Sequence, residues 1–95
     1  MVRSGFMSNF KCSICGYPNL DQPPRDETGA PSFEICPCCG GEFGYNDATL
    51  EAEEDYRRNW IQNGAQWFDP SLKPTDWNLR NQLLNIGINL DEFCK

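Results

Sequence analysis

Two short stretches, CSICG at residues 12–16 and CPCCG at residues 36–40, repeat one pattern: a cysteine, two other residues, a second cysteine and a glycine. Twenty residues separate them, which gives the spacing CxxC-x20-CxxC. A CxxC turn brings two sulfurs to one side of the backbone, and the following glycine permits the left-handed conformation that turns backbone N–H groups toward them. Two such turns predict a closed four-cysteine metal site with the ligands Cys12, Cys15, Cys36 and Cys39.

The repeat also assigns a place to the extra cysteine of the second stretch. When the two turns are aligned, Cys38 falls on Ile14, inside the turn and between the two ligand positions. We therefore expect the side chain of Cys38 to point outward, away from the metal, as a spare thiol. A redox role beside an electropositive ion is the alternative for this residue.

The six cysteines in 95 residues are compatible with either a metal site or a set of disulfides. The start of the chain, MVRSGFMSNFK, has no apolar core or cleavage pattern of an export signal, so we expect a cytoplasmic protein with reduced thiols. No apolar run is long enough to cross a membrane. The even number of cysteines leaves a disulfide framework as the alternative.

The charge and the absence of histidine exclude several classes of function. The net charge is −6, from 14 acidic and 8 basic residues, and the basic residues are scattered. Without a basic stripe to neutralise phosphates, we expect no nucleic-acid partner. The chain has no histidine, the commonest general base and the usual partner of a catalytic cysteine, so we expect no enzymatic activity.

Composition divides the chain into two parts, a four-cysteine zinc ribbon at residues 8–46 and a helical segment at residues 47–95 packed on it as one structural unit. Short strands are expected at residues 10–11 and 33–35, just before the cysteine turns. The loop at residues 18–32 is rich in Pro, Asp and Gly, which predicts an exposed connection or a projecting contact surface. Three aromatic residues that follow the turns are expected to wall off the metal: Tyr17, Phe43 and Tyr45.

Residues 47–63 contain neither Gly nor Pro and predict a helix. Asp47 or Thr49 can cap its start, and Asn63-Gly64 offers a stop. The pairs Glu53–Arg57 and Glu54–Arg58 predict a solvated ion-pair face. Three residues at helical spacing predict a second face that packs on the ribbon: Ala52, Tyr56 and Trp60.

The rest of the second part is expected to hold one more helix. Trp67 and Phe68 lie in a polar connector and are expected to pin it to the core. Residues 76–87 predict a shorter helix with Leu79, Leu83 and Ile86 on one side and Gly87 near its end. The tail at residues 88–95 is expected to be an edge strand or frayed.

Two resemblances add to these expectations. The stretches FKCSICGY and ICPCCGG resemble the two metal-binding turns of rubredoxin, CxxCGY and CPxCG, and imply a rubredoxin-like or zinc-ribbon arrangement around the four cysteines. The spacing between turns is shorter than in rubredoxins, and the helical part has no counterpart there. Over nearly the whole chain, further features are KCSICGYPNL, SFEICPCCGGEFGYND, the spaced Arg57…Trp60…Gly64-Ala65…Trp67-Phe68, and Trp77…Gln82-Leu83…Asn85-Ile86. Together they are similar to the small bacterial CPCC family of cysteine-rich proteins, a resemblance that implies no particular reaction.

The sequence therefore predicts a small α+β, metal-stabilised domain in which zinc is structural and the folded surface binds an unidentified protein partner. A rubredoxin-like iron electron carrier is the first alternative. An immunity or inhibitor protein that covers a basic toxin is a second alternative, and a thiol oxidoreductase that uses Cys38 or Cys94 is a third. The oligomeric state does not follow from these residues.

Overall fold

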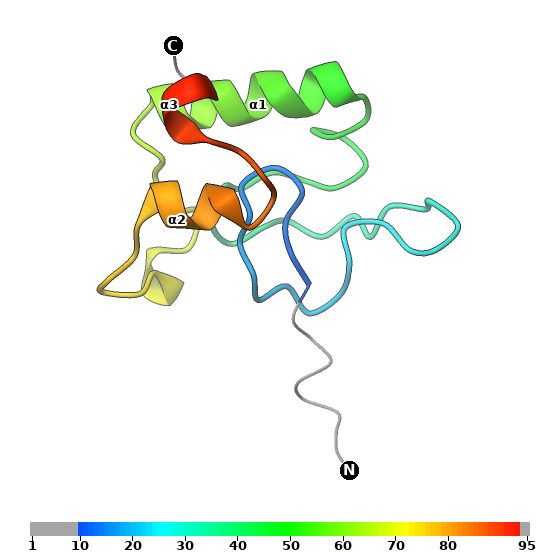
Figure 1. Ribbon diagram of the computed structural model, residues 1–95. Helices are drawn as coiled ribbons and strands as arrows, with labels where there is room; N and C mark the ends of the chain where they lie inside the picture. The colour runs from blue at the N-terminus through cyan, green and yellow to red at the C-terminus, as the bar shows by residue number, and fades with distance from the viewer. Residues whose placement is uncertain (1–9, 94–95) are drawn as a thin grey trace.

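The computed structural model describes residues 10–93 and contains three α-helices and one 3₁₀ helix in that range (Figure 1). The helices are α1 (Leu50–Gln62), η2 (Pro70–Leu72), α2 (Leu79–Leu84) and α3 (Leu90–Phe93). All of them lie in the second part of the chain. The first part runs through turns and loops that are packed against them.

The predicted short strands do not form within the described residues. Only isolated bridges appear there, between Phe10 and Leu20, Arg25 and Pro31, and Ile35 and Glu42. Each cysteine turn reverses the direction of the chain. Within residues 10–93, only one pair of flanking residues forms a bridge across each turn, Phe10 with Leu20 and Ile35 with Glu42. Phe33 adopts a left-handed φ of 62°, which interrupts the extended backbone before the second turn. The ribbon character of this part therefore stays a prediction.

Helix α1 agrees closely with its predicted bounds. The Thr49 side chain accepts a hydrogen bond from the Ala52 N–H at 2.9 Å, so Thr49 is the N-cap. At the other end Asn63 is the C-cap, and Gly64 follows with a left-handed φ of 97°. Trp60 is buried and Tyr56 packs against the core, as predicted for this face of the helix.

The predicted solvated ion-pair face forms only in part. Glu53 and Arg57 make the predicted ion pair at 3.7 Å, but Arg57 is buried rather than solvated. Arg58 donates to the Phe93 carbonyl at 3.1 Å and lies 4.4 Å from the centre of that ring, and no Glu54–Arg58 ion pair forms in the described part of the chain. The i, i+4 rule considers only contacts along one helix, whereas both arginines here reach other segments.

The aromatic side chains of the second part build the core next to the cysteines. Trp67 is buried between Tyr17 and Trp77, with T-shaped contacts at 5.7 and 5.6 Å, and Trp77 continues to Trp60 at 6.5 Å. Trp67 therefore pins the connector as predicted. Its neighbour Phe68 does not, because its side chain is 63% exposed.

The C-terminal part is helical to the end of the described range. Leu83 of α2 is fully buried, and Gly87 follows the helix with φ 75°. The predicted strand or frayed tail is wrong for the described part of the tail, because residues 90–93 form α3, and residues 94–95 lie outside the described range. An Arg80–Asp91 ion pair at 2.8 Å joins α2 to α3, and the Phe93 contacts described above join α3 to α1.

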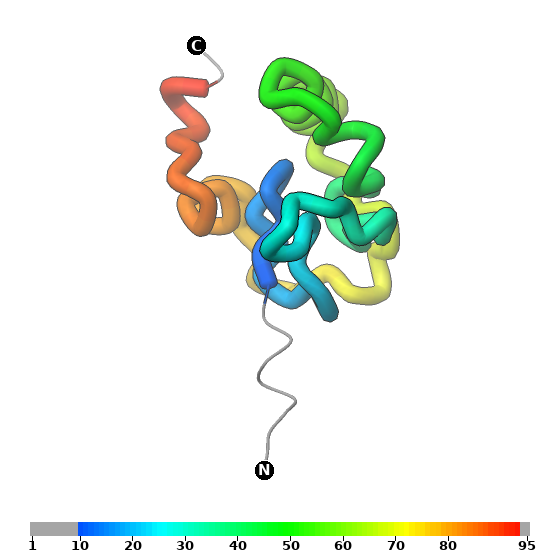
Figure 2. The backbone as a smooth tube through the Cα atoms, turned by 90° about the vertical axis from the view of Figure 1, so that its right-hand side faces the viewer, coloured from blue at the N-terminus to red at the C-terminus, as the bar shows by residue number. Residues whose placement is uncertain are grey.

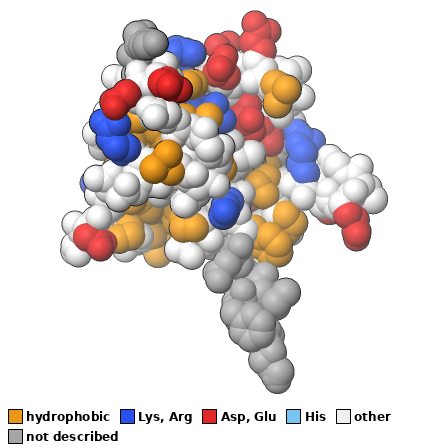
Figure 3. All heavy atoms as spheres, in the orientation of Figure 1, with side chains coloured by type: hydrophobic (Ala, Val, Ile, Leu, Met, Phe, Trp, Pro, Cys, Tyr) orange, Lys and Arg blue, Asp and Glu red, His pale blue; other side chains and the backbone are white. Residues whose placement is uncertain are grey.

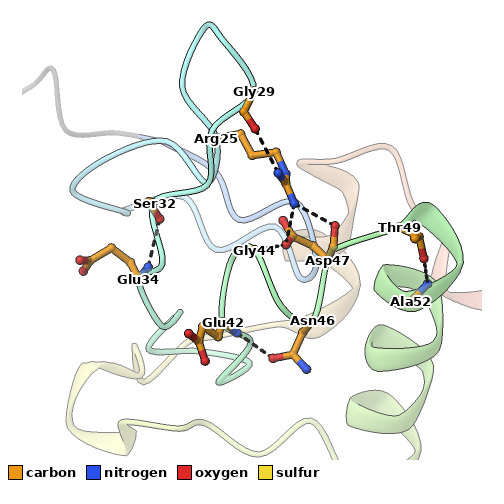
Figure 4. Close-up of polar contacts among 10 residues, drawn as sticks. All are labelled: Arg25, Gly29, Ser32, Glu34, Glu42, Gly44, Asn46, Asp47, Thr49 and Ala52. Atoms are coloured by element: carbon orange, nitrogen blue, oxygen red, sulfur yellow. Dashed lines mark hydrogen bonds and ion pairs between the residues drawn. The ribbon is translucent and has the colours of Figure 1, made fainter.

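The loop at residues 18–32 projects from the rest of the molecule (Figure 1), and its base is fixed by polar contacts. The buried carboxylate of Asp47 accepts hydrogen bonds from the Gly44 N–H at 2.6 Å and from Arg25 at 3.2 Å (Figure 4). Arg25 also donates to the Gly29 carbonyl at 3.1 Å. Asp47 thus anchors the loop rather than capping α1. No helix of residues 10–93 combines the length and the apolar composition that a membrane crossing requires.

Candidate metal centre

The four predicted ligands meet in the structure. The sulfurs of Cys12, Cys15, Cys36 and Cys39 all lie within 4.8 Å of one another and are buried. Each close pair takes one sulfur from each turn: Cys12 lies 3.8 Å from Cys39, and Cys15 lies 3.7 Å from Cys36.

These distances provide a test of whether a metal ion fits. A tetrahedral ion with metal–sulfur bonds of about 2.3 Å places its sulfurs about 3.8 Å apart along each edge. The two close sulfur pairs match that edge. They are also far longer than the roughly 2.05 Å of a disulfide, and the five cysteines of the described range are free thiols. The four sulfurs therefore form a group that could hold a metal ion.

The first turn (residues 12–16) and the second turn (residues 36–40) have the same backbone hydrogen bonds. In each, the glycine N–H donates at 2.9 Å to the carbonyl of the first cysteine, Gly16 to Cys12 and Gly40 to Cys36. Both glycines have left-handed φ values, 87° and 76°, as predicted. One backbone N–H also points at a sulfur in each half of the site, from Ile14 to Cys12 at 3.3 Å and from Gly41 to Cys39 at 3.4 Å.

The outer carbonyls of the first turn are bound by long side chains from α1 and α2. Arg57 donates from Nε to the Ile14 carbonyl at 2.6 Å and from Nη2 to the Ser13 carbonyl at 3.0 Å. From α2 and its C-cap, Gln82 donates to the Cys15 carbonyl at 3.1 Å and Asn85 to the Gly16 carbonyl at 3.0 Å. Figure 2 shows why both helices can contribute, since residues 10–20 lie between α1 and α2.

The outer carbonyls of the second turn are bound mainly by backbone. The N–H of Asp69 donates to the Pro37 carbonyl at 2.8 Å, and the N–H of Phe68 donates to the Cys38 carbonyl at 3.0 Å. The Tyr56 hydroxyl donates to the Cys39 carbonyl at 2.9 Å. Buried carbonyl groups need hydrogen-bond donors. Residues of the second part of the chain supply these donors to both turns.

The predicted outward position of Cys38 is wrong. Its side chain is fully buried, as is that of the aligned Ile14, and its sulfur lies 3.3 Å from the donor Nε2 of Gln82. The alignment gave the correct position within the turn, but the side that faces away from the four sulfurs is covered by other segments. A buried thiol of this kind is poorly placed for redox chemistry. Cys94, the other candidate thiol, lies outside the described residues.

Two of the three predicted aromatic walls are in place. Tyr17 and Phe43 are buried beside the cysteines. Tyr45 is 73% exposed, so its predicted role is wrong. Gly44, with φ 101°, turns the chain between Phe43 and Tyr45 and directs the second ring to the surface.

The thiols of the site do not hold their protons equally. Burial, together with hydrogen bonds among the sulfurs, raises the pKa of Cys15, and the contact with Cys12 raises the pKa of Cys39. The pKa of Cys36 is strongly lowered by its side-chain interactions with the thiols of Cys12 and Cys15. A cation that entered this group would have to displace the remaining protons, which is the usual behaviour of thiolate metal sites.

The residues that bind the turn carbonyls were not predicted. Tyr56 was assigned to the core face and Arg57 to a solvent face, while Gln82 and Asn85 were assigned no role. Their contacts with the turns span 17 to 69 residues in sequence. The resemblance to the CPCC family included Arg57, Gln82 and Asn85 among its matching residues but gave them no role, since contacts over such separations depend on the folded chain.

The sequence is similar to two uncharacterized proteins of Bacillus subtilis. YozI is 36% identical over 88 residues, which cover 76% of this chain and 71% of the relative. YoaQ is 30% identical over 108 residues, which cover 88% of this chain and 92% of the relative. No family model and no solved structure matches, so membership of the CPCC family stays a prediction.

Proposed function

The chain belongs to the family of YozI and YoaQ, and we propose that it is a zinc protein whose metal is structural and whose folded surface binds a protein partner. The observation that carries the zinc part is the buried four-sulfur group, in which two sulfur pairs have the edge length of a tetrahedral thiolate site. Cys12, Cys15, Cys36 and Cys39 would hold the ion. Zinc would supply the positive charge that keeps four buried thiolates together.

The carbonyl contacts support a structural role for the metal. Both turns are bound by residues from the second part of the chain, so fixing the sulfurs also fixes the platform on which α1, α2 and the connector pack. A structural zinc ion can contribute on the order of 10 kcal/mol to folding. A chain of 95 residues buries a small core, so such a contribution would be a large part of its stability.

The surface supports the binding part of the proposal. Large hydrophobic side chains that stand exposed in the described part of the chain include Phe33, Ile35, Phe68 and Leu72. Figure 3 shows hydrophobic side chains gathered on the lower part of one face, and acidic side chains around the start of α1. Apolar patches surrounded by polar residues are typical of protein interaction sites. With no histidine in the chain and all four sulfurs buried, we propose that this protein is not an enzyme.

The test is metal analysis of protein purified without chelator, combined with affinity capture from a lysate by the metal-loaded protein. We expect one zinc ion per chain and a captured protein that the metal-free form does not hold. Absence of any bound metal would refute the zinc part. A metal-loaded protein that captures nothing above background would refute the binding part.

Iron is the second candidate because the same sulfur edges fit it equally well. Iron bound by four thiolates would make the purified protein red, with visible absorption that bleaches on reduction. Such a colour, together with one iron ion per chain, would favour an electron carrier over a protein with structural zinc. A colourless protein that contains zinc would remove this candidate.

A further inference from the structure

A groove lies beside the two cysteine turns and is unused by the metal site. It encloses about 370 Å³ and is lined by segments that are distant in sequence. The connector with η2 provides one wall, and the loop after the first turn and the chain before the second turn provide the others. Its apolar lining residues are Tyr17, Leu20, Ile35, Pro37, Phe68 and Leu72.

The groove combines a buried floor with exposed apolar walls. Tyr17 and Leu20 are buried, whereas Ile35, Phe68 and Leu72 are 48%, 63% and 50% exposed. Three large apolar side chains from two segments are therefore exposed to solvent around one depression. Single exposed hydrophobic residues are ordinary, but a group around a concave site is characteristic of a binding surface.

The structural role of Phe68 does not explain its exposed ring. Its backbone N–H binds the Cys38 carbonyl, and any residue other than proline could make that bond. Its side chain contributes little burial to the core. The structure thus fixes the backbone of Phe68 firmly beside the second turn and leaves the ring free for contact with another molecule.

The charges around the groove identify the kind of occupant. Asp21, Glu34 and Asp69 are the charged residues of the lining, and all three are acidic. The chain as a whole carries a net charge of −6. An apolar side chain in the groove with lysine or arginine on either side would match both features. A second copy of this chain would instead bring two acidic rims together, which disfavours a symmetric dimer through this face.

We propose that this groove binds a basic segment of a partner protein, with an apolar side chain seated against Phe68 and Leu72 and flanking cations facing Asp21 and Glu34. The inference rests on the proposed function, since it names the site and the chemistry of the partner. It adds a prediction that the proposed function alone does not make, namely the face at which binding occurs.

The test uses the full metal-loaded chain and three fluorescein-labelled peptides of equal length. The first has a Phe-Leu centre flanked by lysines, the second has the same centre flanked by glutamates, and the third has a Ser-Gly centre flanked by lysines. Anisotropy titrations give affinities, and ¹H–¹⁵N spectra locate the contact. We expect the first peptide to bind at least about tenfold more tightly than the other two, with shifts at the groove residues.

Matched variants test the assignment of the groove. Phe68→Ala with Leu72→Ala should weaken binding of the first peptide by about tenfold, whereas Leu84→Ala, an equally exposed residue outside the groove, should not change it. Glu34→Gln should weaken binding at low salt more than at high salt, and Glu51→Gln on α1 should have no effect. Unchanged zinc content in all variants shows that the fold is retained.

Several outcomes would overturn the inference. These are equal affinity for the lysine and glutamate peptides, no binding of the first peptide, shifts on another face, or concentration-dependent dimerisation that Phe68→Ala abolishes. Capture of a partner by the groove variant as efficiently as by the unsubstituted chain would refute this site while leaving the proposed function intact. Capture by neither form would count against the proposed function itself.

Discussion

The two cysteine turns have the same sequence pattern and the same internal hydrogen bonds, but the rest of the chain supports them differently. The first turn is held by side chains, from Arg57 on α1 and from Gln82 and Asn85 at α2. The carbonyls of the second turn are held by the backbone N–H groups of Phe68 and Asp69 and by the Tyr56 hydroxyl, while Gln82 also donates to the Cys38 sulfur.

Because of this difference, the support of the second turn depends little on which side chains its donor residues carry. A backbone donor fixes a carbonyl whatever side chain it carries, so Phe68 and Asp69 are free to present their side chains to the groove. At the first turn the supporting side chains of Arg57 and Gln82 are themselves buried and have no such freedom. The first turn is therefore expected to be sensitive to point substitutions, and the second turn to be tolerant of them.

The largest expected effect is common to both turns and comes from the ligands. Cys12→Ser and Cys36→Ser should each release the metal and unfold the chain, a loss on the order of 10 kcal/mol of folding free energy. Metal content and circular dichroism measure both effects. Cys38→Ser is the matched control: it should retain one metal per chain and lose only about 1–2 kcal/mol, since a hydroxyl replaces a buried thiol. Loss of metal in the control would contradict the assignment of ligands.

The next effect distinguishes the turns. Arg57→Met should destabilise the metal-loaded protein by about 3 kcal/mol, because two buried carbonyls of the first turn lose a charged donor. Arg58→Met, one position later, should cost clearly less, since the hydrogen bond and the cation–π contact of Arg58 within residues 10–93 are both with Phe93 and not with a turn. Urea unfolding at saturating metal measures both changes. Equal destabilisation by the two substitutions would show that Arg57 does not support the turn.

The two turn glycines should also differ. Alanine at either position meets a left-handed φ, which costs roughly 1–2 kcal/mol. At Gly16 an added Cβ would also lie 2.3 Å from the backbone carbonyl oxygen of Gln82, whereas at Gly40 it meets the Phe68 side chain at 3.2 Å. We expect Gly16→Ala to be the more destabilising by at least about 1 kcal/mol, because a backbone atom cannot move aside as an exposed ring can. Thermal unfolding of the two variants measures this difference. A lower melting temperature for Gly40→Ala than for Gly16→Ala would contradict the expectation.

The smallest effects are expected at the second turn. Tyr56→Phe removes the side-chain donor to the Cys39 carbonyl and should cost about 1 kcal/mol. Phe68→Ala keeps its backbone donor and should change stability by less than about 0.5 kcal/mol, the range of ordinary surface substitutions. Urea unfolding of both variants checks the order. A large loss in Phe68→Ala would mean that its ring is part of the core and would weaken the argument for the groove.

Local features of this molecule followed from the sequence because short spacings determine them. The CxxCG repeat predicted four ligands and two left-handed glycines, since a turn of five residues leaves few backbone conformations that bring two sulfurs together. The cap at Thr49 and the stop at Asn63-Gly64 predicted α1 for the same reason. The predictions of strands at residues 10–11, at residues 33–35 and at the tail were wrong. A strand needs a neighbouring strand to pair with, and the register of that pairing depends on the whole chain.

What surrounds those local features was decided only by tertiary structure. The burial of Cys38 and Arg57, the exposure of Phe68 and Tyr45, and the groove between the connector and the turns all depend on contacts between distant segments. The Gln82 and Asn85 contacts with the first turn span 67 and 69 residues. The sequence by itself therefore determined which atoms could hold a metal, since that is set by residue type and close spacing. Folding decided which side chains cover those atoms and which remain at the surface, because burial is a property of packed neighbours.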